Sequence, residues 1–487
     1  MCVRSLISGL LGLLFTLSAF AAPVMPVRGY QLDISRMKVP TMASLYRMVD
    51  ILAALNYNQF QLYTEHAFAY PGHEAVWGEF SPMTPAEIRA LDAYCAERGI
   101  ELVPNQNSFG HLDRWLCQHP YNAFAEVPKG GAIYAPWGNS VIRTPSALCP
   151  LDPRSLDFIA SLYDALLPCF RSKLINVGCD ETLELMDSRK LNRSASAVAT
   201  KGPHRVYLDF LLQIHREVAK RGHTMMFWGD IIVNAPELVP ELPEDVIALC
   251  WGYEGNHPFD RQCSLFAQAK RRFMVCPGTS AWGSLSGRVP NMIANIDNAY
   301  AAAVKHGAEG MLLADWGDGG HPNPWLVSIP ALVYFSAKTQ GQSLSEEELA
   351  SAIDRLLGCK VGKSLLEYGK VYAVCGARQG NSTELFLALS HHERYVRSTS
   401  LTNAHLASAL RYRRQAAALA CLDDAPAWVR DDFELLELLY DAVAYRFAEP
   451  QQKNFRARFE PTYRALWLRQ NRPGGLAESL TALFGPF

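Results

Sequence analysis

Short apolar segments alternate with longer amphipathic segments between residue 30 and residue 314. The short segments are rich in β-branched and aromatic residues, which favours strands. We identify eight of them: Tyr30–Ile34, Gln59–Thr64, Glu101–Pro104, Leu174–Gly178, Thr224–Trp228, Val246–Trp251, Phe273–Pro277 and Met311–Ala314. The longer segments have the spacing of helices with one apolar face; they include Met42–Leu55, Pro85–Arg98, Leu156–Phe170, His204–Arg221 and Asn291–His306.

This alternation predicts an α/β fold in which parallel strands are joined by helices. Eight repeats over roughly 300 residues are typical of a closed (β/α)8 barrel, the TIM barrel. An open, doubly wound sheet is the alternative. It is disfavoured because the first strand is followed by Ser35 and Arg36 and not by a glycine-rich phosphate-binding turn.

The pattern changes beyond Gly341, where strand signals become rare. The segments there predict helices at Ser345–Leu357, Ser364–Val374, Ser382–Val396, Leu406–Leu422 and Asp431–Ala448. We therefore expect a catalytic barrel over residues 23–342 and a C-terminal helical region over residues 343–487. Within the barrel, the connection from Ser108 to Arg154 is too long for a plain loop, and such long loops usually serve function.

The N-terminus has the pattern of a secretory signal peptide. Arg4 precedes an apolar run from Leu6 to Phe20, and Ala19-Phe20-Ala21 is similar to a cleavage site. We expect residues 1–22 to be removed and the mature protein to be exported, to the periplasm or the medium, with no membrane attachment. An uncleaved anchor is the alternative, although the run is shorter than the ~20 residues that span a bilayer.

Composition restricts the class of ligand. The net charge is −2, from 46 basic and 48 acidic residues, which gives no electrostatic footprint for nucleic acid or an anionic membrane. The 12 cysteines show no zinc-ligand spacing, so we expect neither a metal nor another cofactor. Cys117 and Cys149 are the first candidates for a disulfide. Cys179 and Cys276 lie in apolar runs, so we expect them to be small buried hydrophobic residues.

Polar and aromatic residues follow the predicted strands where the active site of such a barrel lies. Glu65 follows the second strand, His111 lies beyond the third, and Asp180 and Glu181 follow the fourth. Four later strand ends carry a tryptophan: Trp228, Trp251, Trp282 and Trp316. Indole faces provide an apolar wall for a sugar ring, while carboxylates bind its hydroxyls.

Asp180 and Glu181 are the sharpest local feature. At the end of a strand both side chains can turn into one cavity, where burial and mutual repulsion raise one pKa and produce a proton donor. The alternative is that Asp180 only caps the following helix.

Four motifs, in order along residues 28–340, resemble those of the family 20 glycoside hydrolases, the β-N-acetylhexosaminidases. Arg28-Gly29-Tyr30-Gln31-Leu32-Asp33-Ile34-Ser35-Arg36 is similar to the family's R-G-x-x-x-D-x-x-R. Val177-Gly178-Cys179-Asp180-Glu181 resembles its G-G-D-E signature. Pro104 through Gly110-His111 resembles P-x-x-x-x-x-G-H, and Trp316-Gly317-Asp318 resembles W-x-E.

The resemblance implies exo-acting hydrolysis of terminal N-acetylglucosamine or N-acetylgalactosamine from a glycan. The nucleophile would be the substrate's own 2-acetamido oxygen, which forms an oxazolinium ion, an exception to the two-carboxylate scheme. Glu181 would be the general acid and then the base, and Asp180 would orient the acetamido N–H. Arg28 and Asp318 would hold the outer hydroxyls, and Trp228, Trp251 and Trp316 would form the walls.

The sequence also departs from the family pattern. Cys179 replaces the second glycine of G-G-D-E, Asn107 stands where many members carry an aspartate that pairs with the histidine, and Asp318 replaces a glutamate. Trp282 stands about where the family has a tyrosine that binds the acetamido oxygen.

Three alternatives stay open at this point. The chain could be a non-catalytic carbohydrate-binding barrel, or a retaining glycosidase with a carboxylate nucleophile, such as Glu65 working with Glu181. Glu65 and His66 could also bind a metal with Asp180, but no H-E-x-x-H spacing supports this.

Overall fold

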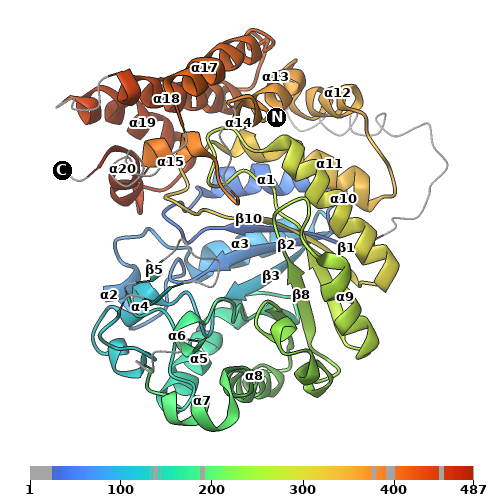
Figure 1. Cartoon of the computed structure of the whole chain (residues 1–487), viewed down its shortest axis with the longest axis vertical. Coiled ribbons are helices and arrows are strands. Elements are labelled where there is room, and N and C mark those ends of the chain that lie inside the picture. Colours follow the sequence, from blue (N-terminus) through green and yellow to red (C-terminus); the bar gives the residue numbers. More distant parts are fainter. Residues whose placement is uncertain are drawn as a thin grey trace, which may run out of the picture.

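The computed structural model describes residues 25–131, 133–134, 141–142, 144–186, 192–375, 380–390, 401–448 and 454–485. At its centre is a closed barrel with the strand order β1-β10-β9-β8-β7-β6-β3-β2, in which every pairing is parallel. The strands are β1 (Val27–Asp33), β2 (Gln59–Thr64), β3 (Glu101–Gln106), β6 (Leu174–Asn176), β7 (Thr224–Trp228), β8 (Ile247–Trp251), β9 (Arg272–Cys276) and β10 (Gly310–Asp315). The predicted TIM barrel is confirmed, and Figure 1 shows helices around it.

In the described part of the chain, seven longer helices surround the barrel, and the five that correspond to predicted helices begin within three residues of the expected positions. The seven are α1 (Met42–Ala54), α3 (Pro85–Ala96), α5 (Pro153–Leu166), α8 (Pro203–Lys220), α9 (Phe259–Gln268), α10 (Val289–His306) and α11 (Ile329–Thr339). Local chemistry fixes these starts: Thr84 caps α3 by accepting from the Glu87 N–H, and the Glu87 carboxylate accepts from the Thr84 N–H. Between β7 and β8 the connection is made by two 3-10 helices, η3 (Ile232–Asn234) and η4 (Pro236–Glu241).

Shorter elements occupy the loops. They are α2 (Glu74–Trp77), α4 (Asp113–Leu116), η1 (Tyr121–Phe124), η2 (Leu167–Cys169), α6 (Leu183–Met186), α7 (Ala195–Lys201) and η5 (Trp325–Ser328). The long connection after β3 contains α4, η1 and a two-stranded antiparallel sheet of β4 (Ile133–Tyr134) and β5 (Val141–Ile142).

The structure corrects the predicted disulfide. Cys117 and Cys149 are both free; Cys117 is exposed, whereas Cys149 is buried with its Sγ 3.8 Å from Ser194 Oγ. Cys179 and Cys276 are free and buried, as predicted.

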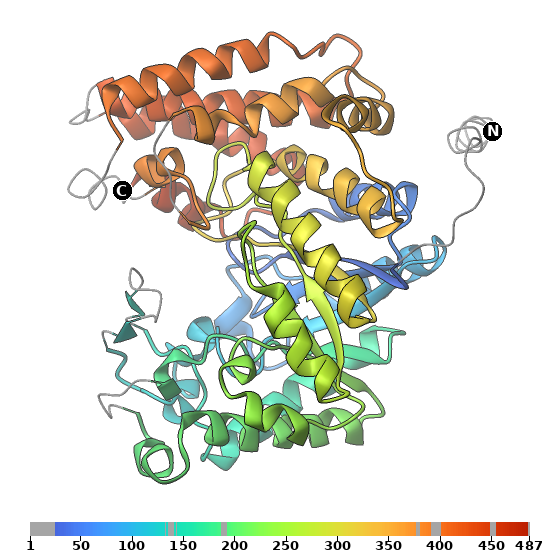
Figure 2. The same cartoon turned by 45° about the vertical axis from the view of Figure 1, so that its right-hand side comes forward.

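The C-terminal region is helical in its described residues. Its helices are α12 (Glu346–Leu357), α13 (Gly362–Tyr368), α14 (Val371–Val374), α15 (Glu384–Ser390), α17 (Asn403–Ala417), α18 (Ala427–Ala448), α19 (Phe455–Gln470) and α20 (Leu476–Phe484). The predicted helix Ser382–Val396 corresponds to α15, and its last part lies outside the described residues, as does the predicted signal peptide. Figures 1 and 2 show α17, α18 and α19 packed together at the end of the molecule opposite α7 and α8.

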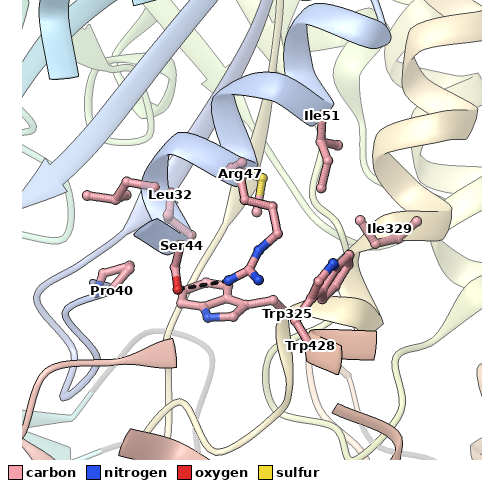
Figure 3. Close-up of a pocket in the computed structure, with 10 residues that line it drawn as sticks. Leu32, Pro40, Ser44, Arg47, Ile51, Trp325, Ile329 and Trp428 are labelled. Carbon is pink, nitrogen blue, oxygen red and sulfur yellow. Dashed lines mark hydrogen bonds between the residues drawn. The ribbon is translucent and has the colours of Figure 1, made fainter. Parts of the chain in front are cut away.

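Polar contacts and an apolar seam join this helical region to the barrel. Asp432 of α18 accepts a hydrogen bond from the Leu326 N–H at 2.8 Å, and Arg472 donates to the carbonyl oxygens of Pro40 and Pro82. Figure 3 shows the seam, where Arg47 of α1 lies 5.0 Å from the Trp428 ring centroid and donates to Ser44 Oγ. The helical region is therefore held against the barrel by specific side chains.

No helix within the described ranges combines the length and apolar character that crossing a membrane requires.

Candidate active site

A pocket of about 240 Å³ lies at the carboxyl ends of the barrel strands. It is lined by Arg36, His111, Asp180, Glu181, Trp228, Trp251, Tyr253, Trp316, Asp318 and Asn381. Seven of these residues are among the ten that the sequence predicts for the site.

A distorted turn after β6 brings Asp180 and Glu181 into this pocket. Three residues of the turn are left-handed: Gly178 at φ +66°, Cys179 at φ +69° and Glu181 at φ +48°. A side chain at 178 would clash, because its Cβ would lie 2.0 Å from Asn107 Oδ1. Cys179 replaces the second glycine of the G-G-D-E signature and adopts this left-handed conformation, which a glycine would adopt without strain. Such backbone strain is often found at functional sites.

The loop after β3 supports this turn. The Asn107 side-chain oxygen accepts from the Cys179 N–H at 3.2 Å, and its amide donates to Tyr63 Oη at 2.8 Å. Gly110 packs so closely that an added Cβ would lie 2.4 Å from the Asp180 carbonyl oxygen. Asn107 therefore stabilises the turn and does not pair with His111.

His111 lies between the two carboxylates. Its Nε2 is 3.3 Å from Asp180 Oδ2 and 3.4 Å from Glu181 Oε2. Burial by itself would lower the pKa of His111, but Asp180 and Glu181 outweigh it and raise that pKa well above its ordinary value. Burial would likewise raise the pKa of Asp180, but His111 and then Arg36 hold that pKa below its ordinary value. These directions favour a charged His111 next to an ionised Asp180.

Asp180 keeps one acceptor available. Its Oδ1 is buried and has no hydrogen-bond partner among the described residues. A buried carboxylate oxygen without a donor is costly, so a substrate N–H placed there would be stabilised.

Asp230 accepts hydrogen bonds from two residues that line the pocket, Glu181 and Trp251. Its Oδ2 accepts from the Glu181 N–H at 3.1 Å and its Oδ1 accepts from Trp251 Nε1 at 3.4 Å. Burial, and then the charge of Asp180, raise the pKa of Asp230 well above its ordinary value. This carboxyl group links the backbone of Glu181 to one aromatic wall.

Four aromatic side chains form the walls. The Trp228 and Trp316 rings lie 5.8 Å apart between centroids, and Trp251 stacks on Tyr253 at 5.2 Å. Trp316 Nε1 donates to Tyr253 Oη at 2.7 Å, which fixes both rings. The result is an apolar box with one phenolic oxygen inside it.

Arg36 and Asp318 also line the pocket. Arg36 Nη1 is 2.6 Å from Asp318 Oδ1, and its guanidinium lies 5.0 Å from the Trp316 ring centroid. The Asp318 side chain is 44% exposed, so its second oxygen can accept a ligand hydroxyl. Asp315 points away from the pocket and accepts hydrogen bonds from Tyr30, Thr279 and Ser328.

The structure corrects three predicted site residues. Arg28 pairs with Met311 at the N-terminal end of the barrel, where its guanidinium donates to the carbonyl oxygens of Asn56 and Met25. Arg28 is the second residue of β1 and therefore lies at the end of that strand opposite the pocket. The arginine in the pocket is Arg36, the last residue of the same motif.

Glu65 and Trp282 lie behind the pocket and do not line it. Glu65 is buried, accepts from Tyr63 Oη at 2.8 Å and lies 3.5 Å from Arg36 Nε. Trp282 is buried behind Tyr253, with ring centroids 4.9 Å apart at an interplanar angle of 89°. Each of these two side chains contacts a residue that lines the pocket, but neither side chain reaches the pocket itself.

Besides Arg36, the predicted site did not include Tyr253, Asp230 or Asn381. Tyr253 and Asp230 carried a signal, because each lies two residues past a strand end. Asn381 carried none, because it belongs to the C-terminal region and reaches the pocket only through tertiary packing.

The fold and pocket define a TIM-barrel protein whose site combines paired carboxylates with a tryptophan-lined box. A family model described as "Glycosyl hydrolase family 20, catalytic domain" matches residues 25–281, which is more than half of the 487 residues. The chain belongs to glycosyl hydrolase family 20.

Relatives by sequence are more distant and match only in part. The chain is 29% identical over 227 residues to a protein named "Beta-hexosaminidase" from Akkermansia muciniphila, an alignment covering 42% of this chain and 45% of that protein. It is 26% identical to "Lacto-N-biosidase" from Bifidobacterium bifidum, covering 38% of this chain and 16% of that protein. The alignments thus span less than half of either relative.

Solved structures share the fold. A Flavobacterium johnsoniae chitobiase structure aligns with a TM-score of 0.55 at 16% identity, covering 94% of this chain and 78% of that chain. A Bacteroides fragilis β-N-acetylhexosaminidase structure aligns with a TM-score of 0.51 at 17% identity, covering 69% and 71%.

Proposed function

We propose that this protein is an exo-acting β-N-acetylhexosaminidase that removes terminal N-acetylglucosamine or N-acetylgalactosamine from glycans by substrate-assisted, retaining catalysis. The observation that carries the proposal is the Asp180 carboxylate, whose pKa is held low by His111 and whose buried Oδ1 has no hydrogen-bond partner in the part of the chain that the structure describes. Neighbouring-group attack needs this acceptor, because it orients the acetamido N–H and stabilises its developing positive charge.

Glu181 protonates the glycosidic oxygen in this mechanism. Attack by the acetamido oxygen on the anomeric carbon then expels the leaving sugar and forms the oxazolinium ion. Glu181 next removes a proton from the water that opens this ion, so the acid of the first step is the base of the second. The side chain is 26% exposed at the pocket, which allows exchange of sugar for water.

The aromatic box suits the N-acetyl group and the sugar ring. Trp228, Trp251 and Trp316 provide apolar faces, and the Tyr253 hydroxyl can donate to the acetamido oxygen, the function that the resemblance places near Trp282. Arg36 and Asp318 would bind the outer hydroxyls, so that a single terminal residue fills the pocket. No described group of three His, Cys, Asp or Glu side chains is arranged to hold a metal ion, and the mechanism uses none.

Two alternative functions, a glycosidase with a carboxylate nucleophile and a non-catalytic binding barrel, lose support from the structure around Glu65 and Glu181. A carboxylate nucleophile at Glu65 would have to contact the anomeric carbon, yet Glu65 does not line the pocket. A non-catalytic binding barrel has no need for the strained turn that presents Glu181.

We also propose that the protein acts after export, because residues 1–22 have the pattern of a cleavable signal peptide. N-terminal sequencing of the protein recovered from the periplasm or the medium tests this, and an intact Met1 in the cell-associated fraction would contradict it.

A substrate panel tests the enzymatic proposal. Aryl β-glycosides of N-acetylglucosamine and N-acetylgalactosamine should be hydrolysed, while the matched glucoside and galactoside, which carry a 2-hydroxyl group, should be turned over negligibly. Efficient hydrolysis of the 2-hydroxy glycosides would exclude neighbouring-group catalysis.

A further inference from the structure

A second cavity of about 410 Å³ adjoins the site already described. It is lined by Glu254 from the loop after β8, by Arg288, Pro290 and Asn291 at the start of α10, and by Tyr372, Ala373 and Gly380 from the C-terminal region. Its volume is in the range of small-ligand sites, and it is larger than the active-site pocket.

Glu254 connects the two cavities. Its carboxylate accepts from Arg288 Nη1 at 2.8 Å and from the Asn381 N–H at 2.6 Å, and Asn381 lines the first pocket. The Asn291 side chain donates to the Tyr253 carbonyl oxygen at 2.7 Å, so the second cavity also shares a wall with Tyr253. A ligand longer than one sugar could therefore contact both cavities.

Arg288 is a buried charged side chain in the lining of this cavity. Its side chain is 3% exposed, and its Nε and Nη2 have no hydrogen-bond partner among the described residues. Unpaired buried donors are costly, so an acceptor from a ligand would be favoured there.

The charge in the cavity is balanced, because the Glu254 carboxylate neutralises the Arg288 guanidinium. The lining therefore offers donors, acceptors and the aromatic ring of Tyr372 without net charge. This is the chemistry that binds a neutral sugar, through hydroxyl hydrogen bonds and ring stacking.

We infer that this second cavity binds the neutral leaving-group sugar, and that the C-terminal helical region thereby helps to determine which glycans are cleaved. The inference rests on the proposed function, since removal of one terminal residue places the rest of the glycan on the leaving-group side. Tyr372 and Glu254 would be specificity-determining residues for the second sugar.

Comparison of two substrates tests this. The kcat/KM of Tyr372→Ala should fall about three- to tenfold for a neutral β-linked N-acetylhexosamine disaccharide, the loss expected for one aromatic stacking contact. For an aryl N-acetylhexosaminide, which has no second sugar, the kcat/KM of Tyr372→Ala should stay within about twofold of the wild-type value. Tyr94→Ala is the matched control, because Tyr94 is half-buried on α3, where it contacts Asp50 and Arg98. This variant should leave kcat/KM unchanged for both substrates.

Two further results decide the assignment. Wild-type protein should prefer the neutral disaccharide to one whose leaving sugar is a uronic acid, and Glu254→Gln should reduce that preference by leaving Arg288 uncompensated. Equal losses on both substrates in Tyr372→Ala, a wild-type preference for the acidic disaccharide, or release of intact disaccharides from a longer chain would each overturn the inference. Absence of aryl N-acetylhexosaminide hydrolysis by the wild-type protein would instead count against the proposed function.

Discussion

His111 Nε2 lies 3.3 Å from Asp180 Oδ2 in the active-site pocket. The same nitrogen lies 3.4 Å from Glu181 Oε2, so one imidazole ring contacts both side chains of the proposed catalytic pair. This contact connects the backbone turn after β6 to the charge state of the proposed catalytic pair.

The His111–Asp180 pair predicts a defined pH window. The pKa of His111 is raised, so the stabilisation that it contributes is complete below its ordinary value near 6.5 and is lost as pH rises through the folded pKa. The pKa of Asp180 is lowered, so its contribution is present above its ordinary value and is lost as pH falls through the folded pKa. Activity should therefore decline on both sides of this window.

His111→Gln tests that assignment through the pH profile of kcat/KM. Loss of the cation should shift the acid limb to higher pH, because Asp180 loses its main opposing charge. An unchanged profile with lower activity at every pH would mean that His111 acts only through packing.

Glu181→Gln should cost about 10²–10⁴-fold in kcat for an unactivated disaccharide, the usual magnitude for losing general acid catalysis. Aryl glycosides with good leaving groups need less protonation and should suffer less in their glycosylation step. Circular dichroism should show an intact fold. Equal losses on both kinds of substrate would indicate that Glu181 is not the acid.

Arg36→Lys should lower kcat/KM by about one order of magnitude or more. Lysine keeps the positive charge but cannot provide the planar fork that contacts Asp318 and a sugar hydroxyl together. Arg28→Ala is a matched control from the same motif, since Arg28 lies at the opposite end of the barrel. If the two variants lose activity to the same extent, Arg36 is not the residue that binds the sugar.

Tyr253→Phe should weaken binding of N-acetylhexosaminides and slightly destabilise the protein. The Trp316 indole N–H loses its acceptor, which costs about 0.5–1.5 kcal/mol for a typical hydrogen bond. Steady-state kinetics and denaturant unfolding measure the two effects separately. A variant with native kinetics would show that the hydroxyl only holds Trp316.

The barrel could be predicted from the sequence because its signal is local. Strands β2 and β7 match their predicted bounds, since each is a short segment that contains two aromatic residues and ends just before polar or glycine residues. The Arg28 error came from the motif resemblance, because the predicted first strand, Tyr30–Ile34, already placed Arg28 at its N-terminal end. The observed strand begins at Val27 and keeps Arg28 at that end, away from the pocket.

The remaining site residues depend on tertiary structure. Trp282 and Tyr253 both follow strand ends, and only the packing of the loop after β9 decides that Trp282 is covered by Tyr253. Asn381 is separated from the last barrel strand by the helices α11 to α14, so no local pattern could place it at the pocket.

Inhibition by a thiazoline derived from N-acetylglucosamine tests the central claim most directly, because this compound mimics the oxazolinium ion. The account predicts competitive inhibition of the wild-type protein at least about 10²-fold tighter than inhibition by free N-acetylglucosamine, as expected for a mimic of a high-energy state. It also predicts a large loss of that affinity in Asp180→Asn, whose uncharged amide cannot stabilise the acetamido nitrogen in the same way. Full hydrolytic activity in the presence of saturating thiazoline would contradict the account.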